Sequence, residues 1–180
     1  MSDISIRPAV AADLEYLVHM DHSYHTDFVW QMDMQNNEHQ VGVTFRETRL
    51  PRSMRVEYPR DFSSLMDDWL KRSAVLVGEN KDELVGYVGL MLGIAPKSTW
   101  VTDFVVLRRL RRQGYGSSLL AAAQSWAREQ GSRRLVIEMQ SKNYPGISMA
   151  NKLGYEFCGY SDRYYTNQDI AIFFAKRIQT

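Results

Sequence analysis

The chain has 180 residues, a formal net charge of +1, and nearly equal numbers of basic and acidic residues, 22 and 21. This length suits one domain with a sizeable core, so we expect residues 1–180 to form a single domain. The balanced charge gives no reason to expect broad electrostatic binding to nucleic acid. No apolar run approaches the roughly 20 residues of a membrane span, and the N-terminus lacks a basic-then-apolar signal segment, so we expect no membrane partner.

The single cysteine excludes an intrachain disulfide and fits a reducing compartment. We therefore predict a cytoplasmic protein. Because Cys158 lies between Phe157 and Gly159, we expect it to be a small core residue rather than a nucleophile.

Hydrophobic periodicity predicts a strand at 4–7 and a helix at 13–20 in the N-terminal part. Residues 21–60 are harder to place: 41–46 looks extended, and Pro51 and Pro59 should interrupt any longer element. A short helix is expected around 62–70, with Asp61 as its cap. The remaining predicted elements are strands at 74–79, 84–92 and 100–107, a helix at 118–128, a strand at 134–139, a helix at 146–153, and a hairpin with strands at 155–165 and 170–176.

This order of elements predicts an α/β fold with a mixed, mostly antiparallel central sheet and helices on both faces. The strand–helix–strand unit at 100–139 should be a right-handed crossover between two parallel strands. The sequence shows no internal repeat and no low-complexity linker.

The loop between the strand at 100–107 and the next helix has the residues of an anion site. It contains Arg111, Arg112, Gly114 and Gly116, and a helix begins directly after it. The first N–H groups of a helix lack intrahelical partners, the helix dipole favours negative charge there, and glycines let a phosphate approach. A dinucleotide fingerprint would need a third glycine where Leu119 stands, and the Gly-Lys-Ser/Thr of a P-loop does not occur.

The run Arg-x-x-Gly-x-Gly at 111–116 resembles the acetyl-CoA signature of the GNAT superfamily of N-acetyltransferases. The resemblance continues downstream, at family-like spacing, through Glu138, Asn143 and the Lys-Leu-Gly-Tyr sequence at 152–155. It implies a GNAT fold in which the two parallel strands splay apart and acetyl-CoA binds as cosubstrate. The cofactor contacts implied are Phe104, Val105, Val106, Arg111, Arg112, Gln113, Gly114, Tyr115, Gly116, Ser117 and Asn143.

The resemblance also implies direct transfer of an acetyl group to an amine, for which a carboxylate base is needed. Glu138 is the first candidate, although it could instead face solvent or pair with Arg133 or Arg134. Asp103 is the second candidate and could equally hold a neighbouring loop. We assign no metal ligand: His19, His22 and His25 recur near Asp21, but the chemistry needs no metal.

The sequence departs from the family pattern at Ala150, where many members have a tyrosine that can protonate the leaving thiolate. Either another tyrosine replaces it, with Tyr144 and Tyr165 as the nearest candidates, or the thiolate leaves with help from water and backbone dipoles. We place Tyr165 with the catalytic residues.

The acceptor pocket should come from residues 21–60, whose carboxylates and aromatic side chains suit a cationic amine. The tail at 159–174 resembles streptothricin acetyltransferases and favours a small-molecule amine. The 111–116 loop also resembles protein N-terminal alanine acetyltransferases of the ribosomal type, so a protein N-terminus stays open as the acceptor. A non-catalytic acyl-CoA-binding sensor is the third alternative, and the apolar run at 170–175 could pair across a homodimer.

Overall fold

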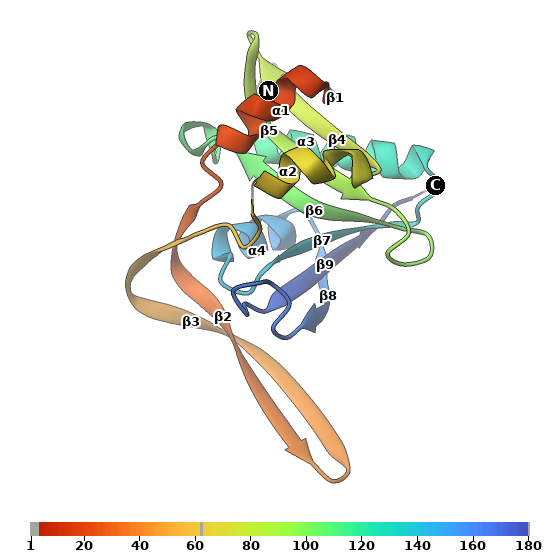
Figure 1. The fold of residues 1–180 in the computed structure, drawn as a ribbon. Helices are drawn as coiled ribbons and strands as arrows, with labels where there is room; N and C mark the ends of the chain where they lie inside the picture. The colour runs from red at the N-terminus through yellow and green to blue at the C-terminus, as the bar shows by residue number, and fades with distance from the viewer. Residues whose placement is uncertain (1–3, 62, 180) are drawn as a thin grey trace.

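The computed structural model describes residues 4–61 and 63–179 (Figure 1). The predicted order of helices and strands is confirmed outside 21–60, and within that region the stretch 41–46, predicted to be extended, lies in a strand. The helices are α1 (Ala11–His19), α2 (Ser63–Asp68), α3 (Tyr115–Glu129) and α4 (Tyr144–Lys152), with short 3-10 turns at Trp69–Lys71 and Arg108–Leu110. The strands are β1 (Ser5–Pro8), β2 (Tyr24–Asn37), β3 (Gln40–Val56), β4 (Ala74–Asn80), β5 (Glu83–Met91), β6 (Ser98–Val106), β7 (Arg134–Gln140), β8 (Glu156–Ser161) and β9 (Ala171–Arg177).

The central sheet has seven strands in the order β1-β4-β5-β6-β7-β9-β8, and helices cover both of its faces. Among the strands of the described residues, β6 and β7 alone pair in parallel. On one face, Leu17 of α1 packs in a cluster with Val77 and Tyr87. On the other, Leu119 of α3 packs in the main core cluster with Ile137. The predicted α/β class and the predicted parallel pair are therefore confirmed.

The parallel pair opens partway along its length. Its ladder runs from Ser98 opposite Arg134 to Val101 opposite Ile137 and stops there. At the same level β6 changes register with β5, because Gly89 pairs with Asp103 and Leu90 pairs with Val101. Thr102 is therefore an extra residue, and such a β-bulge bends its strand and increases the local twist. The bulge turns the end of β6 away from β7 and opens a gap between the two strands.

The strands β2 and β3 form a separate two-stranded arm that projects from the body of the molecule (Figure 1). The expectation that Pro51 interrupts any longer element was wrong, because β3 continues through it. The register shows why: Thr26 pairs with Met54 and Phe28 with Arg49, so residues 50–53 lie in an irregularity of the ladder. At such a position the missing N–H of proline costs no ladder hydrogen bond.

Aromatic side chains anchor the base of the arm on the C-terminal half of the sheet. The Trp30 ring lies 5.5 Å from that of Phe174 and 5.9 Å from that of Phe157, and the Phe45 ring lies 5.4 Å from that of Tyr160. The Trp30 amide also donates to the Ser141 carbonyl at 2.9 Å. A lone hairpin is marginally stable in water, so these contacts fix the arm's position.

Two expectations for the C-terminal strands were wrong. Cys158 is exposed rather than in the core, because it lies in the edge strand β8 at a register shift between Phe157 and Gly159. The run at 170–175 cannot pair across a dimer as an open edge, because β9 lies between β7 and β8 in the sheet. No helix in the described part of the chain is long and apolar enough to cross a membrane.

The close packing of β5 on β6 gives a test of the sheet. A Cβ atom on Gly86 would lie 2.3 Å from the Val105 carbonyl oxygen, whereas one on Gly42 in the arm would meet only the Gln35 Cβ at 4.0 Å. We expect Gly86→Ala to lower the free energy of unfolding by at least about 2 kcal/mol. Gly42→Ala should change it by less than about 0.5 kcal/mol. Urea unfolding measures both, and equal effects would contradict the β5–β6 packing.

Candidate active site

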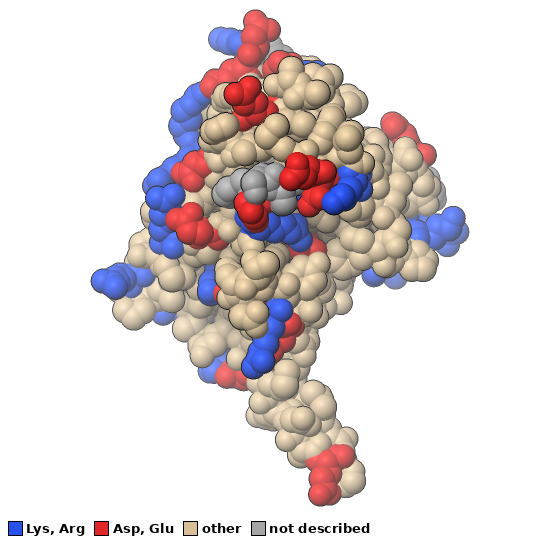
Figure 2. Space-filling model, in the orientation of Figure 1, with Lys and Arg blue, Asp and Glu red and all other residues tan. Residues whose placement is uncertain are grey.

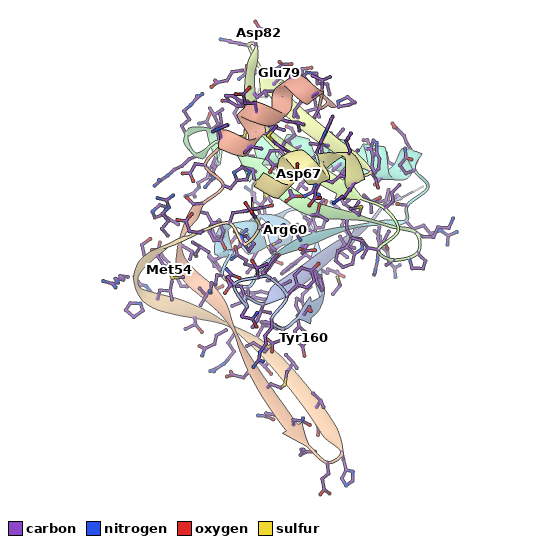
Figure 3. The ribbon with its side chains drawn as sticks, in the orientation of Figure 1. Met54, Arg60, Asp67, Glu79, Asp82 and Tyr160 are labelled. Carbon is purple, nitrogen blue, oxygen red and sulfur yellow. The ribbon has the colours of Figure 1, made fainter. Side chains whose placement is uncertain are left out.

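Two carboxylates lie just beyond the point where β6 and β7 separate. Asp103 is on β6 and Glu138 on β7, and their side chains are 2% and 1% exposed. The residue that joins them is Arg60, from the segment between β3 and α2 (Figure 3). Its guanidinium pairs with Glu138 and lies 3.7 Å from Asp103. The structure thus brings the two predicted carboxylates to one site.

Glu138 neither faces solvent nor pairs with Arg133 or Arg134. One carboxylate oxygen, Oε1, accepts from the Arg60 guanidinium and from the Tyr165 hydroxyl at 3.3 Å. The other, Oε2, accepts from the Tyr164 hydroxyl at 3.0 Å.

Asp103 is held more tightly, from three directions. Its Oδ2 accepts from Arg72 Nε at 2.8 Å and from the Thr102 hydroxyl at 3.0 Å. Its Oδ1 accepts from the Tyr58 hydroxyl. Arg72 is itself 11% exposed, so this is a nearly buried ion pair. This ion pair, with Arg60 as a second cation at 3.7 Å, suits a structural role for Asp103.

Burial and charge act on Glu138 in opposite directions. Burial raises the pKa of the Glu138 carboxyl, because it disfavours the charged form, and the nearby Asp103 charge adds to this. The Arg60 charge and the two tyrosine hydroxyls oppose the rise. Burial and the Glu138 charge raise the pKa of both Tyr164 and Tyr165, so both phenols are protonated at neutral pH.

The β6 side of the gap offers backbone groups to a ligand. The Leu107 amide donates to the Val85 carbonyl on β5 at 2.9 Å. Because backbone groups of successive residues face opposite edges of a strand, the N–H and C=O groups of Phe104 and Val106 face away from β5, into the gap. The Val106 carbonyl accepts from Arg111 Nε at 2.8 Å. No backbone group of the described residues pairs with the Phe104 amide or carbonyl on this side.

The predicted anion loop leads into α3 with the expected geometry. Gly114 precedes the helix in the left-handed conformation, with φ of 95°, which favours glycine. A Cβ on Gly116 would lie 3.2 Å from the Phe104 ring, so the glycine keeps the first turn open beside β6. Arg112, Gln113 and Ser117 are exposed around this turn.

Two members of the loop make internal contacts. The Arg111 side chain donates to three carbonyls, those of Val106, Ser23 and Asp21, and so ties the loop to the start of β2. Tyr115 is buried, and its hydroxyl accepts from Asn80 at 2.6 Å.

The second predicted helix after the loop also begins at a site residue. The Asn143 side chain accepts from the Gly146 amide at 3.0 Å and caps α4. Tyr144 stacks at 5.0 Å against Phe28 of the arm, and Ala150 is fully buried in the core.

The three neighbouring histidines do not converge. His22 is buried and hydrogen bonds to the Met20 carbonyl and the Tyr87 hydroxyl, at 2.6 and 2.8 Å. In the part of the chain that the structure describes, no three His, Cys, Asp or Glu side chains are grouped as a metal ion would require.

The sequence reasoning missed Arg60, Arg72, Tyr58 and Tyr164. Arg60 and Tyr58 lie in a segment without periodicity, and no motif connects them to β6 or β7. Tyr164 could have been found from the sequence, because it stands directly before Tyr165, which the sequence analysis placed at the site. Elsewhere, acidic and basic side chains are interspersed on the face shown in Figure 2.

A parallel pair that opens beside a glycine loop and a buried carboxylate is the arrangement expected of an acetyltransferase fold. Residues 43–155 match the model of the Acetyltransferase (GNAT) family. This is more than half of the chain, and the chain belongs to the GNAT family. It is therefore an acyltransferase that uses acetyl-CoA as cosubstrate.

Several relatives extend the match. The chain is 26% identical over 170 residues to streptothricin acetyltransferase of Streptomyces lavendulae, covering 91% of this chain and 87% of the relative. It is 28% identical over 132 residues to a putative ribosomal protein bS18-alanine N-acetyltransferase of Bacillus subtilis, covering 64% and 86%. Among solved structures, nourseothricin acetyltransferase shares the fold with a TM-score of 0.85 at 23% identity, covering 99% of this chain and all of that one.

The ion pairs of Asp103 predict a large structural effect. Asp103→Asn should lower the free energy of unfolding by about 3 kcal/mol, because it leaves the nearly buried Arg72 without its charge partner. Asp162→Asn is the control: Asp162 is 45% exposed and lies 4.0 Å from Arg163, so its loss should have little effect. Urea unfolding at pH 7 measures both. An Asp103→Asn protein as stable as the control would refute the structural role.

Proposed function

We propose that the protein transfers an acetyl group from acetyl-CoA to a primary amine of a small cationic molecule, with Glu138 as general base. The observation that carries the proposal is the placement of Glu138. Its carboxylate is buried at the apex of the gap between β6 and β7, directly after the last rung of their ladder.

The described residues fit acetyl-CoA. The Phe104 backbone would receive the amides of the pantetheine arm, because its N–H and C=O face the gap. The first-turn N–H groups of α3, opened by Gly114 and Gly116, would receive the pyrophosphate, with Arg112 adding charge. The other predicted contacts belong to the same elements: Val105 to β6, Gln113 to the loop, and Tyr115 and Ser117 to the first turn of α3. Asn143 begins α4. When bound, the cosubstrate supplies the acetyl thioester.

Glu138 would accept the proton that the acceptor amine must lose before it can attack. A positioned carboxylate contributes roughly 10²–10⁴-fold to such a step. Its raised pKa is an advantage here, because a base works best with a pKa closer to the operating pH. Asp103 is a weaker candidate, because two arginines face it, Arg72 at 2.5 Å and Arg60 at 3.7 Å, whereas Glu138 pairs with Arg60 alone among the described residues.

A tyrosine at the C-terminal turn would protonate the leaving thiolate, since Ala150 has no proton to give. Tyr165 is our first choice: it is protonated at neutral pH and its hydroxyl lies 3.3 Å from Glu138. Tyr164 is 45% exposed with its hydroxyl 3.0 Å from the same carboxylate, which makes it the alternative. Tyr144 contacts the Phe28 ring of the arm, and no hydrogen bond joins it to Glu138 among the described residues.

The relatives favour a small-molecule acceptor. The match to streptothricin acetyltransferase spans 91% of this chain, against 64% for the ribosomal alanine acetyltransferase. The arm and the segment 57–60 that follows it lie in the region 21–60 from which we expect the acceptor pocket. A protein N-terminus remains the second candidate, supported by the 28% identity to the ribosomal enzyme.

Acetyl-CoA should stabilise the fold. At about 100 times its dissociation constant it should add about 2.7 kcal/mol, seen as a rise of roughly 5–10 °C in melting temperature. Gly116→Glu should abolish this rise, because a carboxylate would occupy the phosphate position. Gly42→Glu, the same change in the arm, should keep it. We choose Gly116 because Gly114, with positive φ, would be strained by any side chain. Equal shifts in both variants would contradict the loop assignment.

Glu138→Gln should lower kcat by roughly 10²–10⁴ with little change in the affinity for acetyl-CoA. The loss should shrink as the pH rises, because more of the acceptor is then already deprotonated. The measurement is release of free CoA from pH 6 to 9 with a panel of polyamines, streptothricin-type antibiotics and N-terminal peptides. Undiminished turnover across this range would move the role to Asp103 or to water. Turnover with no amine of the panel would favour a non-catalytic acyl-CoA sensor.

A further inference from the structure

Arg60 occupies the first position at which β6 and β7 no longer pair. The last rung of their ladder joins Val101 and Ile137, so the next would join Thr102 and Glu138. In its place, Arg60 Nη1 donates to the Thr102 carbonyl at 2.6 Å and Nη2 donates to the Glu138 carboxylate. One guanidinium therefore bridges the two strands at the apex of the gap.

We propose that Arg60 is a positioning residue for the acetyl transfer, which keeps the Glu138 carboxylate charged and directed into the gap between β6 and β7. This inference rests on the proposed role of Glu138 as base and extends it to the residue that prepares the base.

The surroundings of Glu138 show why it needs such a partner. Its side chain is 1% exposed, and a buried carboxylate without a cation tends to take up a proton. The hydroxyls of Tyr164 and Tyr165 face it from the connection between β8 and β9, and Asp103 faces it from β6. Arg60 is the one cation among the described residues within ion-pair distance of Glu138.

The charges around Glu138 oppose each other. Burial and Asp103 raise the pKa of Glu138, and Arg60 is the largest influence that lowers it. Arg72 faces Asp103 rather than Glu138, at 2.5 Å, and neutralises the second acid. Loss of the Arg60 charge should therefore leave Glu138 protonated over a wider range of pH, and a protonated carboxyl cannot accept a proton from an ammonium group.

The bridge also explains why the residue is an arginine. A guanidinium offers five donors in a planar fork, so it can bind a carbonyl and a carboxylate together, whereas an ammonium is a compact point charge. Arg60→Lys thus retains the charge while weakening the bridge to Thr102. Arg60→Met removes both.

The experiment compares Arg60→Met, Arg60→Lys and the matched control Arg72→Met, which removes an arginine from the same cluster. The Glu138 carboxyl is titrated by carbon-13 NMR in protein labelled at glutamate, with its signal assigned by Glu138→Gln. The acid limb of kcat/KM is measured in parallel with acetyl-CoA and one fixed amine. Because the amine is the same throughout, a shift between variants belongs to the enzyme.

We expect Arg60→Met to move the Glu138 midpoint and the acid limb upward by about 1–3 pH units. Arg60→Lys keeps the charge, so its Glu138 midpoint should lie close to that of the original protein. Arg72→Met should shift the midpoint much less than Arg60→Met does. A folded Arg60→Met protein whose Glu138 midpoint stays within about 0.3 units of the original would overturn the inference, as would an equal shift in Arg72→Met. If Arg60→Met does not fold, Arg60→Gln removes the same charge while keeping a donor for Thr102.

The two proposals can fail separately. Full activity of Glu138→Gln would remove Glu138 as the base, yet the NMR titration would still report whether Arg60 controls its charge. An unchanged titration in Arg60→Met would reject the role of Arg60, even if Glu138→Gln is inactive.

Discussion

The β-bulge at Thr102 is the feature on which the site depends. One extra residue in β6 ends the parallel ladder after Val101 and exposes backbone groups and side chains that a continuous sheet would have paired. Buried polar groups are costly without partners, so the opening has to be lined by groups that satisfy one another. Arginines meet this need at both ends: Arg60 binds the Thr102 carbonyl, and Arg111 binds the Val106 carbonyl. Between them, the Phe104 backbone is left for a ligand.

The same opening produces a balanced cluster of buried charges. Asp103 and Glu138 are offset by Arg60 and Arg72, so the core of the site carries no net charge. The two acids nevertheless differ. Asp103 faces two arginines, Arg60 and Arg72, and resembles a fixed structural anion. Among the described residues Glu138 has a single cationic partner, Arg60, which comes from a linker rather than from a strand. Such different surroundings of two neighbouring acids are typical of sites that divide structural and proton-transfer roles.

Much of this could be predicted from the sequence, for identifiable reasons. The Gly-x-Gly sequence at 114–116 predicts the helix N-terminus, because the left-handed conformation of Gly114 before the helix favours glycine. Glu138 can be picked out because it is an isolated acid in an apolar strand. Arg60, Tyr58 and Arg72 could not be found in the same way. Their roles depend on where a linker crosses the sheet, which is a long-range property without a local pattern. The prediction at Pro51 failed for a related reason. A proline normally interrupts a strand because it lacks an N–H for the ladder, but residues 50–53 lie in a register irregularity where no ladder hydrogen bond is lost.

The arm connects these elements. Along its paired part, one face carries Phe28, Trp30, Met32 and Phe45, and the opposite face carries polar residues such as Gln31, Asp33 and Arg46. The apolar face packs its aromatic rings on β8 and β9, the Trp30 amide binds the loop after β7, and Phe28 stacks on Tyr144 at the start of α4. From the other strand, β3 leads directly to Tyr58 and Arg60. The arm is therefore fixed on the C-terminal half of the sheet, while its linker reaches across to β6. By holding both sides of the gap through one continuous segment, residues 24–60 set the position of Arg60, and through it that of the Glu138 carboxylate.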